Sequence, residues 1–122
     1  MTAVEIKSGH PKGRESLESI LGDPKEYFLN ALKRDAKIIK NHSHVRFEVL
    51  GFTDDMECID SQCRDLSIRR ARLVYDWLIS NGVAPASLKP PVGHGSEMPI
   101  ADNGTDEGRE KNRRVEINVS VD

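Results

Sequence analysis

Two segments in which apolar and polar residues alternate constrain the fold of this chain most: HVRFEVLGF at 44–52 and RRVEINVSV at 113–121. In the first segment the apolar side chains occupy odd-numbered positions from 45 to 49, and in the second they occupy odd-numbered positions from 115 to 121. A period of two places these side chains on one face of a strand. The sequence therefore predicts two half-exposed strands, each with one face in a core.

Helical patterns occupy much of the chain before and between these strands. Asp23-Pro24-Lys25-Glu26 is typical of a helix start, with an N-cap Asp, Pro at the first helical position and Glu at N3. Apolar residues then recur at helical spacing to about Asn41. A second helix is predicted from about Leu66 to Ser80, ended by Asn81-Gly82, and a short third one should be capped by Thr105.

Weaker signals complete the outline. Ala3–Ile6 is compatible with a short strand and Glu15–Leu21 with a short helix, while the two prolines of SLKPPVGHG at 87–95 suit only an edge strand. Strands interleaved with helices predict an α/β or α+β fold in which helices cover one sheet. A length of 122 residues suits a single domain that spans residues 1–122.

Composition excludes several classes of function. Eighteen Lys and Arg residues against twenty Asp and Glu leave a net charge of −2, and aromatic residues make up only 5% of the chain. This balance argues against a nucleic-acid partner, which requires a basic surface. The sequence has no membrane-spanning segment, and MTAVEIKSGH at its start has no apolar signal region. A cytoplasmic protein and a domain of a longer exported protein both remain open.

One charged residue lies on the apolar face of the second predicted helix. At about 100° per residue, Arg70 falls in the middle of the apolar stripe, whereas Arg69 and Arg72 fall toward the polar side. The stripe consists of Leu66, Leu73, Val74, Trp77 and Leu78. A buried charge without a partner costs several kcal/mol, roughly 3–5 when a pair is broken. We therefore expect an anionic partner for Arg70.

Asp54 is the natural candidate for that partner, because it follows the strand of 44–52 at the end where α/β sheets place ligands. Two interpretations are open. Arg70 forms a structural ion pair with a nearby acid such as Asp54, or Asp54 and Arg70 form a two-point clamp for a zwitterion, with the ammonium on Asp54 and the carboxylate on Arg70. Charged hydrogen bonds of this kind contribute roughly 1.5–3 kcal/mol each.

Three segments of the chain carry a resemblance to a known family. They are GFTDD at 51–55, LSIRRARLVYDWLISNGV at 66–83 and PIADNGTDEGREKNRRVEINV at 99–119. In this order and spacing they resemble the OmpA-like (OmpA C-terminal) domain family, with its TD turn, LSxxRA helix start and NRRVE strand. The resemblance covers residues 43–121, and residues 1–22 form a divergent N-terminal segment.

The resemblance implies an OmpA-like βαβαβ sandwich with one mixed sheet of about four strands covered by helices. It also implies a non-catalytic periplasmic domain of Gram-negative bacteria that uses no cofactor. Such domains bind the diaminopimelate of the peptidoglycan stem peptide and anchor an outer-membrane or envelope protein to the cell wall. Peptidoglycan is thus the expected partner, together with envelope proteins.

The resemblance also assigns site residues. The ligand aspartate of the family matches Asp54 and its ligand arginine matches Arg70, while Leu66 lines the site through its backbone and Thr53 flanks it. The NRRVE strand, here beginning with Asn112 and Arg113, borders the pocket and is mainly structural.

The loop after the TD turn departs from the family pattern. Where the family usually has a Gly, in TDxxG, this chain continues with Asp55-Met56-Glu57, and Cys63 replaces an Asn of the family. We hypothesise that a disulfide between Cys58 and Cys63 organises the loop instead. In a reducing compartment the two cysteines would remain thiols.

Three other functions compete with peptidoglycan binding. One is an enzyme in which Cys58 or Cys63 is a nucleophile and His94 its base. Another is a hard-cation site, such as one for calcium, built from the acidic residues Asp54, Asp55, Glu57, Asp60 and Asp65. The third is an OmpA-like fold that has lost its ligand site and acts as a protein-interaction module of an envelope or secretion complex.

Overall fold

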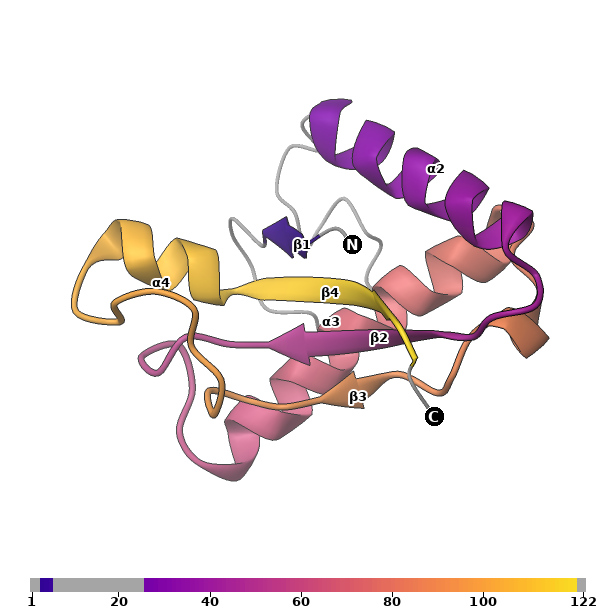
Figure 1. Ribbon diagram of the computed structural model, residues 1–122. Helices are drawn as coiled ribbons and strands as arrows, with labels where there is room; N and C mark the ends of the chain where they lie inside the picture. Colours follow the sequence, from indigo (N-terminus) through magenta and orange to yellow (C-terminus); the bar gives the residue numbers. More distant parts are fainter. Residues whose placement is uncertain (1–2, 6–25, 121–122) are drawn as a thin grey trace.

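The computed structural model describes residues 3–5 and 26–120, in which a mixed sheet carries two long helices on one face (Figure 1). The elements are β1 (Ala3–Glu5), α2 (Glu26–Asn41), β2 (Phe47–Phe52), α3 (Ser61–Ser80), the 3-10 helix η1 (Pro85–Ser87), β3 (Val92–Gly93), α4 (Asp106–Asn112) and β4 (Arg114–Val119). The predicted α+β fold class is confirmed. The predicted helix at 15–21 and the cap at 23–25 lie outside the described residues.

The strand order in the sheet is β1-β4-β2-β3. Strand β4 runs antiparallel to both β1 and β2, whereas β2 and β3 are parallel. In the register of β2 and β4, Phe47 lies opposite Val119 and Phe52 lies opposite Arg114. Strand β3 occupies the sheet edge directly after Pro90 and Pro91, as expected for a segment with prolines.

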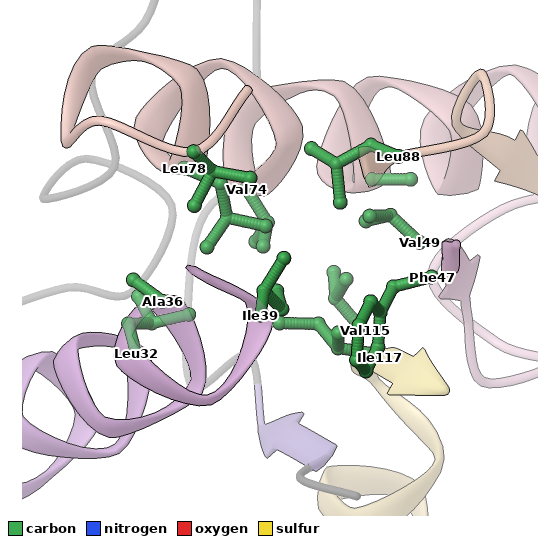
Figure 2. Close-up of a cluster of buried hydrophobic side chains, with 12 residues drawn as sticks. Leu32, Ala36, Ile39, Phe47, Val49, Val74, Leu78, Leu88, Val115 and Ile117 are labelled. Carbon is green, nitrogen blue, oxygen red and sulfur yellow. The ribbon is translucent and has the colours of Figure 1, made fainter. Parts of the chain in front are cut away.

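The hydrophobic core lies between the sheet and the helices α2 and α3 (Figure 2). Phe47 and Val49 of β2 and Val115 and Ile117 of β4 enter it, which confirms the predicted alternation at these positions. Val119, predicted on the same face, is 43% exposed, and Val121 lies outside the described residues. The buried residues of the cluster are Leu32, Ala36, Ile39, Phe47, Val49, Ala71, Val74, Leu78, Val83, Leu88, Val115 and Ile117. Helix α3 approaches β2 so closely that a Cβ on Gly51 would lie 1.9 Å from the Ser67 carbonyl oxygen.

Helix α3 begins at Ser61 rather than at the predicted Leu66. The predicted start was wrong because the first turn of α3 carries little apolar periodicity: Cys63 is buried there, while the residues on either side of Cys63 are exposed. The predicted end is confirmed, since Asn81 is the C-cap and Gly82 has a φ of 95°. The cap of α4 is also confirmed, because the Gly108 N–H donates to Thr105 Oγ1 at 2.9 Å.

Candidate functional site

The candidate site is formed where β2 ends and the loop to α3 begins. Thr53 and Asp54 follow Phe52 directly, and both are only 2% exposed. The backbone N–H of Thr53 donates to the carbonyl of Gly95 at 2.9 Å, which ties this strand end to the segment after β3. The start of the loop is therefore buried and fixed, although its sequence is dominated by charged residues.

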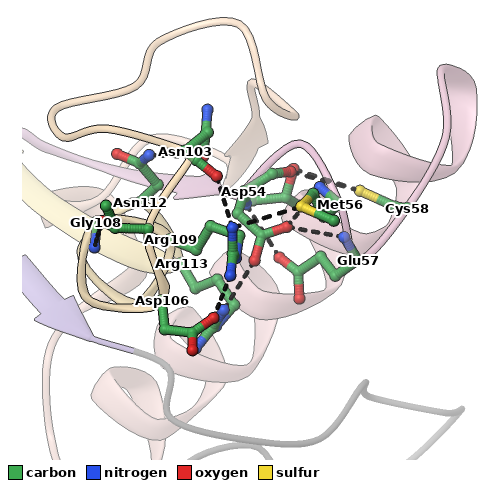
Figure 3. Close-up of polar contacts among 12 residues, drawn as sticks. Asp54, Met56, Glu57, Cys58, Asn103, Asp106, Gly108, Arg109, Asn112 and Arg113 are labelled. Carbon is green, nitrogen blue, oxygen red and sulfur yellow. Dashed lines mark hydrogen bonds and ion pairs between the residues drawn. The ribbon is translucent and has the colours of Figure 1, made fainter.

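Hydrogen bonds from three directions surround the Asp54 carboxylate (Figure 3). Oδ1 accepts the backbone N–H groups of Met56 and Glu57, both at 2.8 Å, and Oδ2 accepts Nη1 of Arg113 at 2.8 Å. Burial raises the pKa of Asp54, but the bonds from Arg113, Glu57 and Met56 outweigh it and hold this pKa below its usual value. Asp54 is thus held as a carboxylate at neutral pH.

Arg70 of α3 is 1% exposed, as the helical periodicity predicted, and Arg69 and Arg72 are exposed. Its anionic partner is Glu57, not Asp54. Nη1 and Nη2 each donate to one Glu57 carboxylate oxygen at 2.7 Å, and Nη1 also lies 3.4 Å from the Phe52 carbonyl oxygen.

The interpretation of Asp54 as the direct ion-pair partner of Arg70 is therefore wrong. Glu57 lies three residues further along the loop, and its Oε2 also accepts the backbone N–H of Asp54 at 3.1 Å. Asp54 is instead paired with Arg113. Glu57 connects the two ends of the site, because one carboxylate contacts both the Arg70 guanidinium and the Asp54 backbone.

The remaining predicted site residues differ in how they relate to this centre. Leu66 is 8% exposed and lies one helical turn before Arg70 on α3. Asn112 is fully buried at the end of α4, where its side chain accepts from the backbone N–H groups of Ile100 and Ala101 and donates to the Ala101 carbonyl. Asn112 thus anchors the loop between β3 and α4, whereas Arg113 reaches the site itself.

Cys58 and Cys63 form a disulfide with an Sγ–Sγ distance of 2.07 Å. It links the residue after Glu57 to the first turn of α3. In this structure neither sulfur is a thiol nucleophile, and the His94 ring stacks on Phe52 with 5.3 Å between ring centroids. An open cavity of about 380 Å³ lies beside the bridge and is lined by Asp60, Ser61, Cys63, Arg64, His94, Gly95, Ser96 and Glu97.

The acidic residues of the loop are not gathered into a metal site. Within the part of the chain that the structure describes, no three His, Cys, Asp or Glu side chains are arranged to hold a metal ion. Asp54 and Glu57, the two acidic residues of the loop nearest the site, are each engaged by an arginine.

Sequence reasoning missed the roles of Glu57 and Arg109. Arg109 of α4 donates to the Asn103 carbonyl at 2.8 Å and lies 3.4 Å from the Met56 sulfur, next to the Asp54 loop (Figure 3). For Glu57, a signal was present in the sequence: it is a carboxylate at the position where the resembled family has a Gly. A carboxylate at that position of the loop is a candidate partner for the buried Arg70.

The fold and the two buried charges define a class of protein: a small α+β domain with buried charged side chains at the carboxyl end of a central strand. This chain belongs to the OmpA family, whose family model matches residues 19–113. Over 91 residues it is 44% identical to the peptidoglycan-binding protein ArfA of Mycobacterium tuberculosis, and over 90 residues 40% identical to the outer membrane porin F of Pseudomonas fluorescens. These matches cover 73% and 74% of this chain and 27% of each relative.

Solved structures agree with this assignment. The C-terminal domain of MotB from Helicobacter pylori superimposes with a TM-score of 0.78 at 32% identity, covering 100% of this chain and 86% of that domain. The peptidoglycan-associated lipoprotein of Burkholderia pseudomallei gives a TM-score of 0.72 at 24% identity, covering 79% and 80% of the two chains, which supports the fold alone. No helix among the described residues is both long enough and apolar enough to cross a membrane.

Proposed function

We propose that this domain binds peptidoglycan through the diaminopimelate of the stem peptide, without catalysing a reaction. In this proposal Asp54 binds the ammonium of the free end of diaminopimelate and Arg70 binds its carboxylate. Thr53, Leu66, Asn112 and Arg113 shape the surrounding pocket. The domain would act in the periplasm and anchor an outer-membrane or envelope protein to the cell wall.

The observation that carries the proposal is the burial of two opposite charges at one strand end. Asp54 is 2% exposed and Arg70 is 1% exposed, and a single carboxylate, that of Glu57, contacts the Asp54 backbone and the Arg70 guanidinium. Burying such groups is costly, and charges at this depth interact strongly with a complementary ligand. A diaminopimelate end group presents an ammonium and a carboxylate on one carbon atom, which suits a site of two adjacent opposite charges.

A pull-down with diaminopimelate-type peptidoglycan tests this proposal. The wild-type chain should sediment with the polymer, whereas Asp54→Ala and Arg70→Ala should each reduce the bound fraction at least about tenfold, as expected for losing one charged hydrogen-bonding group. Arg69→Ala is the matched control, because Arg69 neighbours Arg70 on α3 but is exposed, with its Nη2 3.4 Å from Asp65 Oδ2. Equal binding by the wild type and an Asp54→Ala/Arg70→Ala double variant would contradict the proposal.

A second candidate function is a protein-interaction module of an envelope or secretion complex, with the fold kept and the ligand site lost. The observation that favours it is that both charges of the site have partners within the chain, Arg113 for Asp54 and Glu57 for Arg70. This candidate predicts no binding to the polymer by any of these proteins, so the same pull-down separates the two functions.

A further inference from the structure

Glu57 binds the two Arg70 nitrogens, Nη1 and Nη2, that a ligand carboxylate would need. Its two carboxylate oxygens accept Nη1 and Nη2 of Arg70 at 2.7 Å each, which is the bidentate arrangement that a free carboxylate adopts on a guanidinium. The Glu57 side chain is 10% exposed, so the pair is largely shielded from water. A ligand carboxylate and the Glu57 carboxylate therefore cannot both bind Arg70 in this way.

The same arrangement occurs at the other charge of the site. Nη1 of Arg113 lies 2.8 Å from Asp54 Oδ2, where a ligand ammonium would bind, and the Arg113 side chain is 22% exposed. A cation on Asp54 and a carboxylate on Arg70 together imitate the two charges of a zwitterion. The chain's own side chains thus fill the site that it offers to a ligand.

The loop that carries Glu57 is restrained close to that residue. Cys58, the next residue, is bonded to Cys63 in the first turn of α3, and its sulfur lies 3.4 Å from the Thr53 hydroxyl. The short covalent ring over residues 58–63 limits how far the Glu57 backbone can move away from Arg70. The bridge therefore favours the self-occupied arrangement.

Arg70 is nevertheless not fully satisfied by Glu57. Its Nε is buried and has no hydrogen-bond partner among the described residues. A buried donor without a partner is costly, so the unsatisfied Nε offsets part of the free energy that the pair with Glu57 contributes. A ligand that completes the hydrogen bonds of the guanidinium would gain from this deficit.

From these contacts we propose that Glu57 is an intramolecular competitor of the ligand. Peptidoglycan binding then requires residues 55–58 to rearrange so that the Glu57 carboxylate leaves Arg70 and the stem-peptide carboxylate replaces it. The disulfide between Cys58 and Cys63 sets how readily this happens. This inference rests on the proposed function and adds to it the residue that sets the affinity of the site.

The test is the affinity of the whole chain for a soluble muropeptide that contains diaminopimelate, measured by isothermal titration calorimetry. Glu57→Gln removes the charge and leaves only one acceptor for the two Arg70 donors, so the ligand competes with a weaker partner. We expect Glu57→Gln to bind about tenfold more tightly than the wild type, while the variant itself melts at a lower temperature. Asp55→Asn is the control, because it makes the same charge change at an exposed position of the same loop and should leave the affinity unchanged.

A second variant tests the role of the bridge and serves if Glu57→Gln does not fold. Cys58→Ser/Cys63→Ser keeps Glu57 and Arg70 but frees the loop, so it should also bind more tightly than the wild type, by a smaller factor. If the wild type binds and Glu57→Gln binds equally well or more weakly, the competitor role is overturned and the proposed function stays intact. The double serine variant decides in the same way if Glu57→Gln does not fold. Absence of binding in every protein overturns both.

Discussion

Arg70 and Arg114 are both almost completely buried, and both contact Phe52 at the end of the central strand. The guanidinium carbon of Arg114 lies 3.8 Å from the centre of the Phe52 ring, whereas Arg70 Nη1 lies 3.4 Å from the Phe52 carbonyl oxygen. Arg114 is opposite Phe52 in the sheet and Arg70 belongs to α3. Two arginines with similar burial thus contact the same residue from different elements, and their hydrogen-bond partners differ.

The partners of Arg114 are mostly backbone groups. It donates to the carbonyl oxygens of Asn112 and Met98 at 3.2 and 3.0 Å and to the Glu116 carboxylate at 2.6 Å on its own strand. Arg70 depends instead on Glu57, a side chain of a loop. Backbone partners hold a guanidinium in place for structural reasons, whereas a side-chain partner on a loop can be exchanged. Burial alone therefore does not distinguish an arginine held by backbone groups from one held by a side chain that can be exchanged.

The largest expected effect comes from Arg114→Met. This change removes the donor to the Asn112 and Met98 carbonyl oxygens and to Glu116 Oε2, together with the contact with the Phe52 ring, so we expect the free energy of unfolding to fall by about 3–5 kcal/mol. Arg70→Met should cost less, about 1–3 kcal/mol, because the Glu57 side chain can turn toward water. Urea denaturation at neutral pH, followed by circular dichroism, measures both.

The comparison between the two arginines fails if Arg70→Met destabilises the chain as much as Arg114→Met. That result would make Glu57 and Arg70 a structural ion pair, like Arg114 and Glu116 on β4. Arg69→Met is a control for introducing a methionine on α3, since Arg69 is exposed and its loss should change the free energy of unfolding by less than about 0.5 kcal/mol.

A smaller effect concerns the acidic end of the site and depends on pH. Because the pKa of Asp54 is lowered in the folded protein, its ionisation stabilises the fold above the unfolded-state value of 3.8, and this contribution is lost as the pH falls through the folded-state pKa. At pH 7, Asp54→Asn should cost about 1–2 kcal/mol, because the bond from Arg113 loses its charged acceptor. Urea denaturation between pH 7 and pH 2.5 gives the difference at each pH.

The stability curves of the wild type and Asp54→Asn should converge below pH 3.8 and run parallel at higher pH. A constant difference over the whole range would show that the hydrogen bonds of Asp54 do not depend on its charge. Asp55→Asn provides the comparison for an exposed carboxylate in the same loop and should follow the wild-type curve closely.

The helical periodicity of 66–80 was sufficient to predict which arginine is buried. Arg70 lies in the apolar stripe and Arg69 and Arg72 do not, and the structure confirms this choice. The two alternating strands and the Thr105 cap were also predictable, because each depends on residues that are close together in the sequence. Local patterns are sufficient for features whose cause is local.

The charge pairs of the site were not predictable in the same way. The loop at 53–60 has no periodicity that would favour Glu57 over its acidic neighbours as the partner of Arg70. The bond between Asp54 and Arg113 joins residues 59 positions apart, and it follows from the register that places Phe52 opposite Arg114. That register depends on how the whole sheet is paired, which the sequence of either strand does not specify.

The smallest expected effect is at the exposed pair of Arg64 and Glu97, whose Nη2–Oε1 distance of 2.9 Å is close to those of the buried pairs. Their side chains are 65% and 63% exposed, so water solvates both charges and little free energy depends on their contact. Arg64→Gln should therefore change the free energy of unfolding by less than about 0.5 kcal/mol, and that difference should vanish in high salt. Urea denaturation at low and high salt measures it. A loss as large as that of Arg70→Met would mean that distance, and not burial, decides what an arginine pair contributes here.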